Sequence, residues 1–478
     1  MSENEGDGFS RAELAAPSAI EIRDLIRERK ISVVEAVEAS LQRVDRFNPA
    51  INAIVTLNPR AIDDARALDQ RLASGEDPGP LCGLTVGIKD VTQVASLRTT
   101  FGSTIYSDHV PDEDAVVVQR LREAGAIILG KTNTPEFAAG GNTFNEVFGR
   151  TRNPWDTTKS AGGSTGGGAA ALVTGMIQLA EGTDLGGSLR IPASFCGVVG
   201  LRPSVGLVPT HPTDWSWDTL QVTGPMARTA EDVALMLQSI AGATEHSPLR
   251  QPVAGRDFVA AVKAGPKRGA RIAYVSDPTR IGIEPEIEHI CREAAFGLKD
   301  AGPNLAIEEI DLDLSPARAA FLALRGLWFV THMAPRMDKA SQFGTNVGNN
   351  VRAGLTTTTE QLAAAEQERN RLWHLFRDFF MRFDYLVTPC MAVPPFPVEQ
   401  NYPDAIAGTP MQTYVDWLAP TFVLSLTGLP VASVPCGLDS GGMPVGLQIV
   451  ARPSDEEAAL ALAGAMQQRY PKATASRA

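Results

Sequence analysis

Apolar residues recur at helical spacing in the first fifty residues of the chain. Ser18 with Glu21 and Ser32 with Glu35 have the spacing of two capping boxes, which predicts helices that begin just after each serine. Each predicted helix has an apolar face, made of Ile22, Leu25 and Ile26 in the first and Val34, Val37, Leu41 and Val44 in the second. Both faces predict packing against the body of the protein.

The pattern changes to strand alternation near residue 80. In GLTVGIKD (83–90), apolar residues alternate with Thr, Gly and Lys, which predicts a strand that ends at Lys89. Residues 115–124 predict a helix that ends at Gly125, and AIILG (126–130) predicts a short buried strand. This order of strand, helix and strand favours a layered α/β fold.

The rest of the chain continues in the same style. Strands are expected at RIAYVSD (271–277) and FDYLVTPCM (383–391), a hairpin around DSGG (439–442), and helices over 284–301 and after a Ser454–Glu457 cap. The Pro-rich stretch 394–410 has no clear period and predicts a lid, a binding loop or a disordered segment. Because no repeat or linker is evident, a single domain is expected, with a frayed tail at TASRA.

Composition narrows the class of protein. The 478 residues are 44% hydrophobic and 21% charged, with a net charge of −12 and no basic run, which argues against nucleic-acid binding and a polybasic membrane anchor. The start lacks a signal-peptide pattern, and no apolar run is long enough to span a bilayer. Five scattered cysteines and six scattered histidines predict buried thiols in a reducing cytoplasm, with no metal site and no cofactor.

Three features carry candidate chemistry. Lys89 ends the predicted strand, where a lysine is usually a solvated edge charge; in a buried pocket, desolvation would make its amine a base. GGSTGG (162–167) and GTDLGGSLR (182–190) lie in a region, about 140–210, that is dense in small residues and suits backbone held close to a ligand. Each could also be a flexible loop. GGSTGG fits the loose GxSxG elbow pattern, but neither cluster has the GK[ST] ending of a P-loop.

Together these motifs resemble the amidase signature family of serine hydrolases. The order Lys-Asp, GGS[ST]GG and GTDxGGS[IVL]R followed by P[AS]xxxG appears here as GLTVGIKD, AGGSTGGGAAA and GTDLGGSLRIPASFCGVVGLRPS. The segments KTNTPEF, GRTRNPWD, GPMARTAEDVA, LTGLPVASVP and MPVGLQIVARP are also similar to the family, so the resemblance covers about residues 18 to 470. It implies one α/β domain, 1–478, with a large mixed β-sheet flanked by helices on both faces.

Within that domain, the resemblance implies four parts: N-terminal helices (1–75), a catalytic signature core (80–240), a variable substrate-shaping region (245–420), and a C-terminal hairpin and helix (421–470).

The resemblance also implies the reacting groups. Ser188 corresponds to the nucleophile, Ser164 to a bridging serine whose preceding peptide bond, Gly163–Ser164, is cis, and Lys89 to the general base. The chemistry is coherent, because a serine hydroxyl needs a base to remove its proton and an amide nitrogen needs a proton before it leaves. This is a Ser–Lys variant of triad chemistry without histidine.

The glycine-rich loop is expected to supply an oxyanion hole. Its donors would be the backbone N–H groups of Leu185, Gly186, Gly187 and Ser188. Asp184 and Thr165 are expected to bond within this loop and hold it rigid; many family members have Ser where Thr165 stands. Arg190 is expected to pair with a buried carboxylate or carbonyls, and Cys196 to be a core residue.

The substrate is less defined by the sequence. The family's glutaminase subunits carry a VKRRIxLG segment that clamps a carboxylate; the counterpart here is VGNNVRAG (347–354), with Asn349 and Asn350 at the arginine positions. This argues against glutamine, although Arg352 could form a shifted clamp. Without an N-terminal membrane helix or apolar cap, a membrane-bound lipid amidase is disfavoured. The candidate pocket aromatics are Phe144, Trp215, Trp217, Trp328 and Tyr414, with HPTDWSW (211–217) the best segment.

The sequence therefore predicts a cytoplasmic amidohydrolase, a monomer or homodimer, that cleaves small apolar or aryl amides. The same acyl-enzyme chemistry extends to carbamates, as in a urethane-cleaving enzyme, and to esters. The alternative is a glutaminase-type subunit of a tRNA-dependent amidotransferase, which would depend on a partner chain and on channelled ammonia. The partner expected in the first case is the small-molecule amide or carbamate substrate, with no nucleic acid and no membrane.

Overall fold

The computed structural model describes residues 16–302 and 304–470. Its centre is one eleven-stranded mixed sheet. In spatial order the strands are β1 (Ile54–Leu57), β3 (Ile127–Thr132), β2 (Thr85–Lys89), β8 (Leu179–Asp184), β10 (Val222–Ala227), β9 (Val199–Arg202), β16 (Val431–Leu438), β17 (Pro444–Val450), β13 (Tyr385–Pro389), β11 (Arg271–Tyr274) and β12 (Ala306–Glu309). Short hairpins are formed by β4 (Phe144–Asn145) with β5 (Gly149–Arg150), β6 (Arg152–Asn153) with β7 (Asp156–Ser160), and β14 (Ala405–Ile406) with β15 (Thr409–Pro410).

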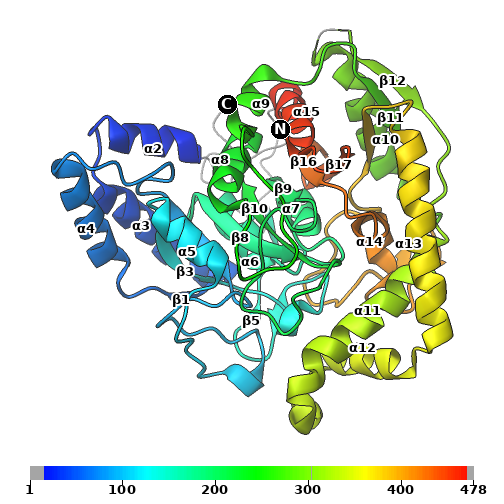
Figure 1. Ribbon diagram of the computed structural model, residues 1–478, viewed down its shortest axis with the longest axis horizontal. Coiled ribbons are helices and arrows are strands. Elements are labelled where there is room, and N and C mark those ends of the chain that lie inside the picture. Colours follow the sequence, from blue (N-terminus) through cyan, green and yellow to red (C-terminus); the bar gives the residue numbers. More distant parts are fainter. Residues whose placement is uncertain (1–15, 303, 471–478) are drawn as a thin grey trace.

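Helices cover both faces of the sheet (Figure 1). One face is packed by α2 (Ala19–Arg27), α5 (Val116–Glu123), α8 (Ala230–Ile240), α9 (Phe258–Ala264), α10 (Pro285–Gly297) and α15 (Glu456–Arg469). The other is packed by α3 (Val33–Ile51), α4 (Ala61–Ala73), α6 (Gly166–Val173), α7 (Arg190–Cys196), α11 (Ala317–Met333), α12 (Thr345–Thr356), α13 (Thr359–Phe379) and α14 (Ala419–Ser425). The predicted α/β/α sandwich is therefore confirmed.

Strand alternation divides the core into two layers. On β3, Ile128 belongs to the apolar cluster under α5 and α8, whereas Ile127 and Leu129 belong to the cluster under α3 and α6. Because successive side chains on a strand point to opposite faces, both layers fill from the same strands. On β2, the side chain of Lys89 points to the same face of the sheet as Thr85 and Gly87. This is the face that α6 covers.

Several predicted elements have the expected ends. Ser18 and Ser32 are the N-caps of α2 and α3, each in a complete capping box. The hairpin of β16 and β17 pairs antiparallel around residues 439–443. The Pro-rich stretch 394–410 packs onto the protein, since Ser160 N–H donates to Phe396 O at 2.8 Å and Asn142 Nδ2 to Val398 O at 3.0 Å.

One local prediction was wrong. The last helix is capped by Asp455, which accepts from Ala458 N–H at 3.1 Å, rather than by Ser454, whose backbone has φ +59°. The predicted apolar stripe of α3 does face the core: Val37 and Val44 are buried, and Val34 and Leu41 are half-buried against the same apolar cluster. The predicted fray at TASRA and the polar start 1–14 lie outside the described residues.

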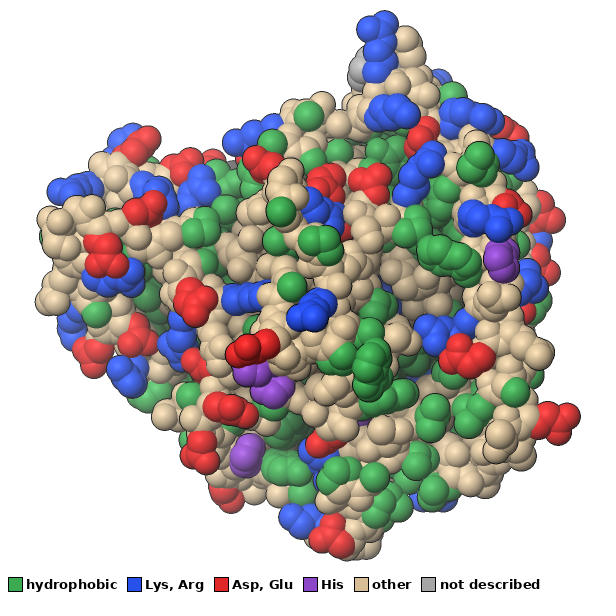
Figure 2. All heavy atoms as spheres, in the orientation of Figure 1, with side chains coloured by type: hydrophobic (Ala, Val, Ile, Leu, Met, Phe, Trp, Pro, Cys, Tyr) green, Lys and Arg blue, Asp and Glu red, His purple; other side chains and the backbone are tan. Residues whose placement is uncertain are grey.

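The surface is mixed in charge. On the face seen in Figure 2, acidic and basic side chains are interspersed. None of the described helices has both the length and the hydropathy that a bilayer crossing requires.

All five cysteines are buried as free thiols, as predicted.

Candidate active site

The carboxyl ends of three parallel strands place the candidate residues. β2 lies between β3 and β8 and is parallel to both, so Lys89 at the end of β2 stands beside Asp184 at the end of β8. Loops beyond such strand ends are the usual binding sites of open α/β sheets. Here Ser164 lies in the loop before α6, and Ser188 lies in the loop between β8 and α7.

Lys89 and Ser164 are in direct contact. Lys89 Nζ lies 2.7 Å from Ser164 Oγ and 2.9 Å from Thr183 Oγ1. The Lys89 side chain is fully buried, and burial lowers its pKa to about 7 despite the opposing fields of Glu181 and Asp184. The amine is therefore neutral in a large fraction of molecules at neutral pH, which is the form that accepts a proton.

Ser188 lines the same cavity as Ser164. Its carbonyl oxygen accepts from Thr165 N–H at 3.2 Å, which ties the two serine-bearing loops together. Its hydroxyl is half-buried and forms no hydrogen bond within the described part of the chain. The Gly163–Ser164 peptide bond is cis, as predicted. Ser164 and Ser188 thus line one small cavity, and Lys89 lies behind Ser164, in contact with its hydroxyl.

The backbone of the loop after β8 is shaped by its two glycines. Gly187 has φ +120°, and a Cβ there would lie 2.3 Å from Thr421 Oγ1. A Cβ at Gly186 would lie 3.1 Å from the ring of Phe321, so the loop is in contact with α11. No other described residue accepts a hydrogen bond from the N–H of Leu185, Gly186 or Ser188, and these three residues line the cavity.

Gly187 differs from the prediction. Its N–H donates to Asp184 Oδ1 at 2.8 Å, so this hydrogen is directed into the protein and is not available to a substrate. The reason is the charge of Asp184, which attracts the nearest donors of its own loop. The set of four expected oxyanion donors is therefore reduced to Leu185, Gly186 and Ser188.

Asp184 is the centre of a buried charge network. Its carboxylate accepts from Leu189 N–H at 3.1 Å and from two nitrogens of Arg190 at 2.9 and 3.0 Å. Burial raises its pKa, but Arg190 and Arg202 more than offset this and hold the pKa of Asp184 well below its ordinary value. The expected contact of Arg190 with a buried carboxylate is present, and its other donors reach Thr421 O and Gln448 Oε1, both at 2.8 Å.

Thr165 supports the loop through its backbone. Its backbone N–H binds Ser188 O, while its buried hydroxyl has no hydrogen-bond partner among the described residues. The hydroxyl is packed against Gly182, where no side chain competes for the space. Cys196 lies in the core, where burial raises the pKa of its thiol and keeps it protonated.

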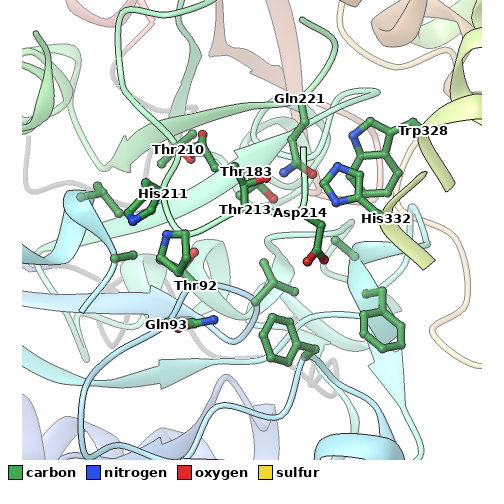
Figure 3. A pocket seen from close by; sticks show the side chains of 18 of the residues that line it. Thr92, Gln93, Thr183, Thr210, His211, Thr213, Asp214, Gln221, Trp328 and His332 are labelled. Atoms are coloured by element: carbon green, nitrogen blue, oxygen red, sulfur yellow. Dashed lines mark hydrogen bonds between the residues drawn. The ribbon is translucent and has the colours of Figure 1, made fainter. Parts of the chain in front are cut away.

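Two adjoining cavities form the site. The inner cavity, about 30 Å³, is lined by Ser164, Ser188 and several aromatic side chains, among other residues. The outer cavity, about 230 Å³, shares Phe137, Ala138, Thr183, Gln221 and Trp328 with it. In Figure 3, Thr92, Gln93 and His211 lie on one side of the outer cavity, and Gln221, His332 and Trp328 on the other.

Only part of the predicted aromatic wall is in place. Trp328 lines both cavities and Tyr414 lines the inner one. Phe144 is in neither, because it lies on the β4–β5 hairpin beneath the guanidinium of Arg150. Trp215 lines a smaller neighbouring cavity, and Trp217 is 66% exposed. In the segment HPTDWSW, the residues His211, Pro212, Thr213 and Asp214 line the outer cavity, whereas its two tryptophans do not.

Sequence reasoning missed other residues of the site. Thr183 belongs to the GTDLGGSLR motif and contacts Lys89, so closer attention to that strand would have found it. Phe137, Phe321, Phe329, Leu418 and Arg325 also line the inner cavity. On α11 the aromatic residues follow ordinary helical spacing, which does not distinguish a cavity wall from a core. The described residues hold no group of three or more His, Cys, Asp or Glu that could bind a metal ion.

Comparison with known proteins identifies the family. The family model described as Amidase matches residues 35–460. An acylamidase of Rhodococcus erythropolis is 35% identical over 443 residues, 91% of each chain, and a glutamyl-tRNA(Gln) amidotransferase subunit of Carboxydothermus hydrogenoformans is 35% identical over 488 residues, 95% of this chain and 98% of that one. The crystal structure of a bacterial aryl acylamidase of the amidase signature family superposes with a TM-score of 0.89 at 27% identity, covering 96% of this chain and 97% of that one. The chain therefore belongs to the amidase signature family and is an amide hydrolase by family.

Proposed function

We propose that the chain is a serine amidase that hydrolyses the C–N bond of small amides through an acyl-enzyme on Ser188. The observation that carries the proposal is the 2.7 Å contact between Lys89 Nζ and Ser164 Oγ, beside a cavity that Ser188 also lines. A serine hydroxyl is a weak nucleophile until a base takes its proton. A buried neutral amine is such a base, and a second hydroxyl is a relay to it.

The geometry around Lys89 suits proton transfer. A neutral amine has two hydrogens and one lone pair, and Thr183 offers two acceptors, Oγ1 at 2.9 Å and the carbonyl at 3.4 Å. The lone pair then faces the hydroxyl of Ser164. As Ser188 Oγ bonds to the substrate carbonyl carbon, its proton passes to Ser164 Oγ while the proton of Ser164 passes to Lys89. The contact between the serine hydroxyls is expected to tighten when substrate binds.

The second half of the reaction uses the same groups in reverse. The tetrahedral oxyanion is held by the N–H groups of Leu185, Gly186 and Ser188; in other enzymes one such donor contributes about 2.7–4 kcal/mol. Lys89 returns its proton through Ser164 to the substrate nitrogen, the C–N bond breaks, and the amine leaves. A water then attacks the acyl-enzyme with the same relay, releasing the carboxylic acid and Ser188.

The walls of the cavities support an apolar, aryl-containing substrate. Phe101, Phe137 and Trp328 line the outer cavity and offer apolar surface to a planar amine. An aryl carbamate would follow the same route, since the released carbamic acid loses carbon dioxide, and an aryl ester would need no proton on its leaving group. Amides, carbamates and esters of this shape are the proposed substrate range.

The test is covalent labelling combined with turnover. A fluorophosphonate probe is expected to label the purified chain, and Ser188→Ala is expected to lose both labelling and hydrolysis of an acyl 4-nitroanilide by about 10⁶-fold in kcat. Ser239→Ala is a matched control, because Ser239 lies on α8, where its hydroxyl binds Leu235 O. Labelling that persists in Ser188→Ala would remove Ser188 from the proposal.

The second candidate is a glutaminase subunit of an amidotransferase. It is favoured by the 35% identity to the amidotransferase subunit of Carboxydothermus hydrogenoformans, equal to that of the acylamidase. The expected arginines are absent, since Asn349 and Asn350 take their places, and Arg352 is exposed outside both cavities. Glutamine hydrolysis by the purified chain, without any activity on nitroanilides, would favour this candidate over the first.

A further inference from the structure

Arg325 is a buried charge in the wall of the inner cavity. Its residue is 7% exposed, and it lines the same cavity as Ser164 and Ser188. Arg190, by contrast, is paired with Asp184 through two nitrogens. Arg325 forms no ion pair with any acidic side chain in the described ranges. A buried guanidinium without a counter-charge is costly, which indicates that the missing negative charge comes from outside the chain.

Two neutral side chains hold the guanidinium in place. Arginine can only donate, so Asn350 Oδ1 and Tyr414 Oη both accept from it. Asn350 Nδ2 in turn donates to Asn346 O at 2.6 Å and to Tyr414 Oη at 2.5 Å. The Tyr414 oxygen thus accepts two hydrogens, and its own hydroxyl hydrogen is left to donate elsewhere.

The result is a cavity end that offers donors and positive charge. Arg325 has five N–H groups, and its contacts with Asn350 and Tyr414 leave some of them free to bind a ligand. Tyr414 lines the same cavity. The guanidinium also lies 4.7 Å from the ring centre of Phe329 and 5.2 Å from that of Tyr414, which fixes its plane. A planar fork of donors matches a carboxylate, the anion to which arginine binds in a bidentate manner.

The order of product release decides which part of the substrate lies here. The amine must leave before water attacks, whereas the acyl group stays bound to Ser188. Ser188 lines the inner cavity and not the outer one, so the acyl group is expected to lie at the inner cavity and the departing amine at the outer one. The lining of the inner cavity includes no Asp or Glu, so the ammonium group of an amino acid would have no partner there.

We propose that the preferred substrates are amides whose short acyl group ends in a carboxylate, which Arg325 and Tyr414 bind. This rests on the proposed function and narrows it, since the amine remains apolar or aryl while the acyl end is anionic. The class is that of the mono-amides of short dicarboxylic acids. Arg325 is then a specificity residue, and Asn350 is a positioning residue that acts through it.

The experiment compares two nitroanilides of equal shape. N-succinyl-4-nitroanilide ends in a carboxylate, and N-(4-methylpentanoyl)-4-nitroanilide has two methyl groups in place of its oxygens. The wild-type chain is expected to show at least about tenfold higher kcat/KM for the succinyl compound, from the range typical of a charged hydrogen bond. Equal rates, or a preference for the neutral compound, would overturn the proposal.

Variants separate recognition from folding. Arg325→Gln is expected to remove the preference, lowering kcat/KM for the succinyl compound at least tenfold more than for the neutral one. Arg352→Gln is the matched control, because Arg352 is exposed on neighbouring α12 and lines neither cavity, and it should keep the wild-type ratio. An equal loss for both compounds in Arg325→Gln would mean that Arg325 only maintains the fold.

A third measurement needs no variant. Succinate is expected to inhibit wild-type turnover competitively, at least tenfold more tightly than 4-methylpentanoate. If glutamine is hydrolysed while the succinyl compound is not, or if succinate is the weaker inhibitor, the inference fails. Its failure differs from failure of the proposed function, which would appear as no labelling of Ser188 and no cleavage of either nitroanilide.

Discussion

The two walls of the catalytic cavity are built differently. One wall comes from the loops after β2 and β8 and before α6, where Lys89, Ser164 and the Asp184 loop are fixed by buried hydrogen bonds. The other comes from α11 and the segment before α14, and consists of aromatic rings with Arg325 among them. In the proposed mechanism, the first wall has the groups that react, and the second has the shape that selects the substrate. The division teaches that chemistry and specificity can change separately in this fold.

A second contrast lies within the first wall. Lys89 and Lys131 are on neighbouring strands, and both are fully buried, so burial lowers their pKa values to about 7 and about 8. Lys89 Nζ contacts hydroxyl groups at the cavity, whereas Lys131 Nζ faces Asp90 at 3.8 Å and Thr99 Oγ1 at 3.0 Å. Two lysines with similar burial therefore differ in their partners: Lys89 faces hydroxyl groups beside the cavity, and Lys131 faces the carboxylate of Asp90.

Replacing Lys89 tests the reactive side of this contrast and should have the largest effect. Lys89→Met is expected to lower kcat/KM on the order of 10³-fold, because the relay loses its base, while the shape of the side chain is kept. Thermal unfolding should change little, since a neutral buried amine is exchanged for an apolar group. Nitroanilide turnover and melting temperature measure the two effects. Near wild-type turnover in this variant would exclude Lys89 as the base.

Replacing Lys131 tests the structural side. Lys131→Met leaves the carboxylate of Asp90 buried without its cation, so the free energy of unfolding is expected to fall by about 3–5 kcal/mol. Denaturant unfolding measures this loss. The double change Lys131→Met with Asp90→Asn should recover part of it, because the unpaired charge is then absent. A Lys131→Met variant as stable as wild type would show that the pair contributes nothing to the fold.

The pH profile sharpens the role of Lys89. Burial lowers its pKa to about 7, so the amine is protonated and inactive below that pH and neutral above it. We expect kcat/KM to rise about tenfold per pH unit below 7 and to level off above it. The residual activity of Lys89→Met should lack this limb. An unchanged limb in that variant would assign the titration to another group.

The sequence was sufficient for the first wall and insufficient for the second. Ser164, Ser188 and Lys89 stand in motifs whose resemblance to the amidase signature family predicted that they act together, and the structure places Lys89 against Ser164 beside a cavity that Ser188 lines. Gly187 escaped correct prediction, because motif reading cannot show that Asp184 takes its N–H.

The second wall depends on tertiary packing. Phe321 and Phe329 lie two turns apart on α11, a spacing that core helices share, so nothing in the pattern marks them as cavity residues. Arg325 lies between them, and its position in the cavity could not be predicted either, because a single arginine in an apolar helix does not form a recognisable motif. Tyr414 was proposed from its residue type alone. The structure was needed to show that it and Asn350 meet the same guanidinium.

The smallest effect is expected at the tryptophan that sequence reasoning wrongly placed in the pocket. Trp217 is 66% exposed and lines neither cavity, so Trp217→Ala should leave kcat/KM within about twofold and change the free energy of unfolding by no more than about 0.5 kcal/mol. Trp328→Phe is the contrast, because Trp328 lines both cavities and its Nε1 donates to Asp218 Oδ2 at 2.6 Å. The Trp328→Phe variant should have a several-fold higher KM for aryl amides, while labelling of Ser188 persists. If Trp217→Ala raised KM as much as Trp328→Phe, the aryl group would bind over the surface loop, and the division between the two walls would have to be redrawn.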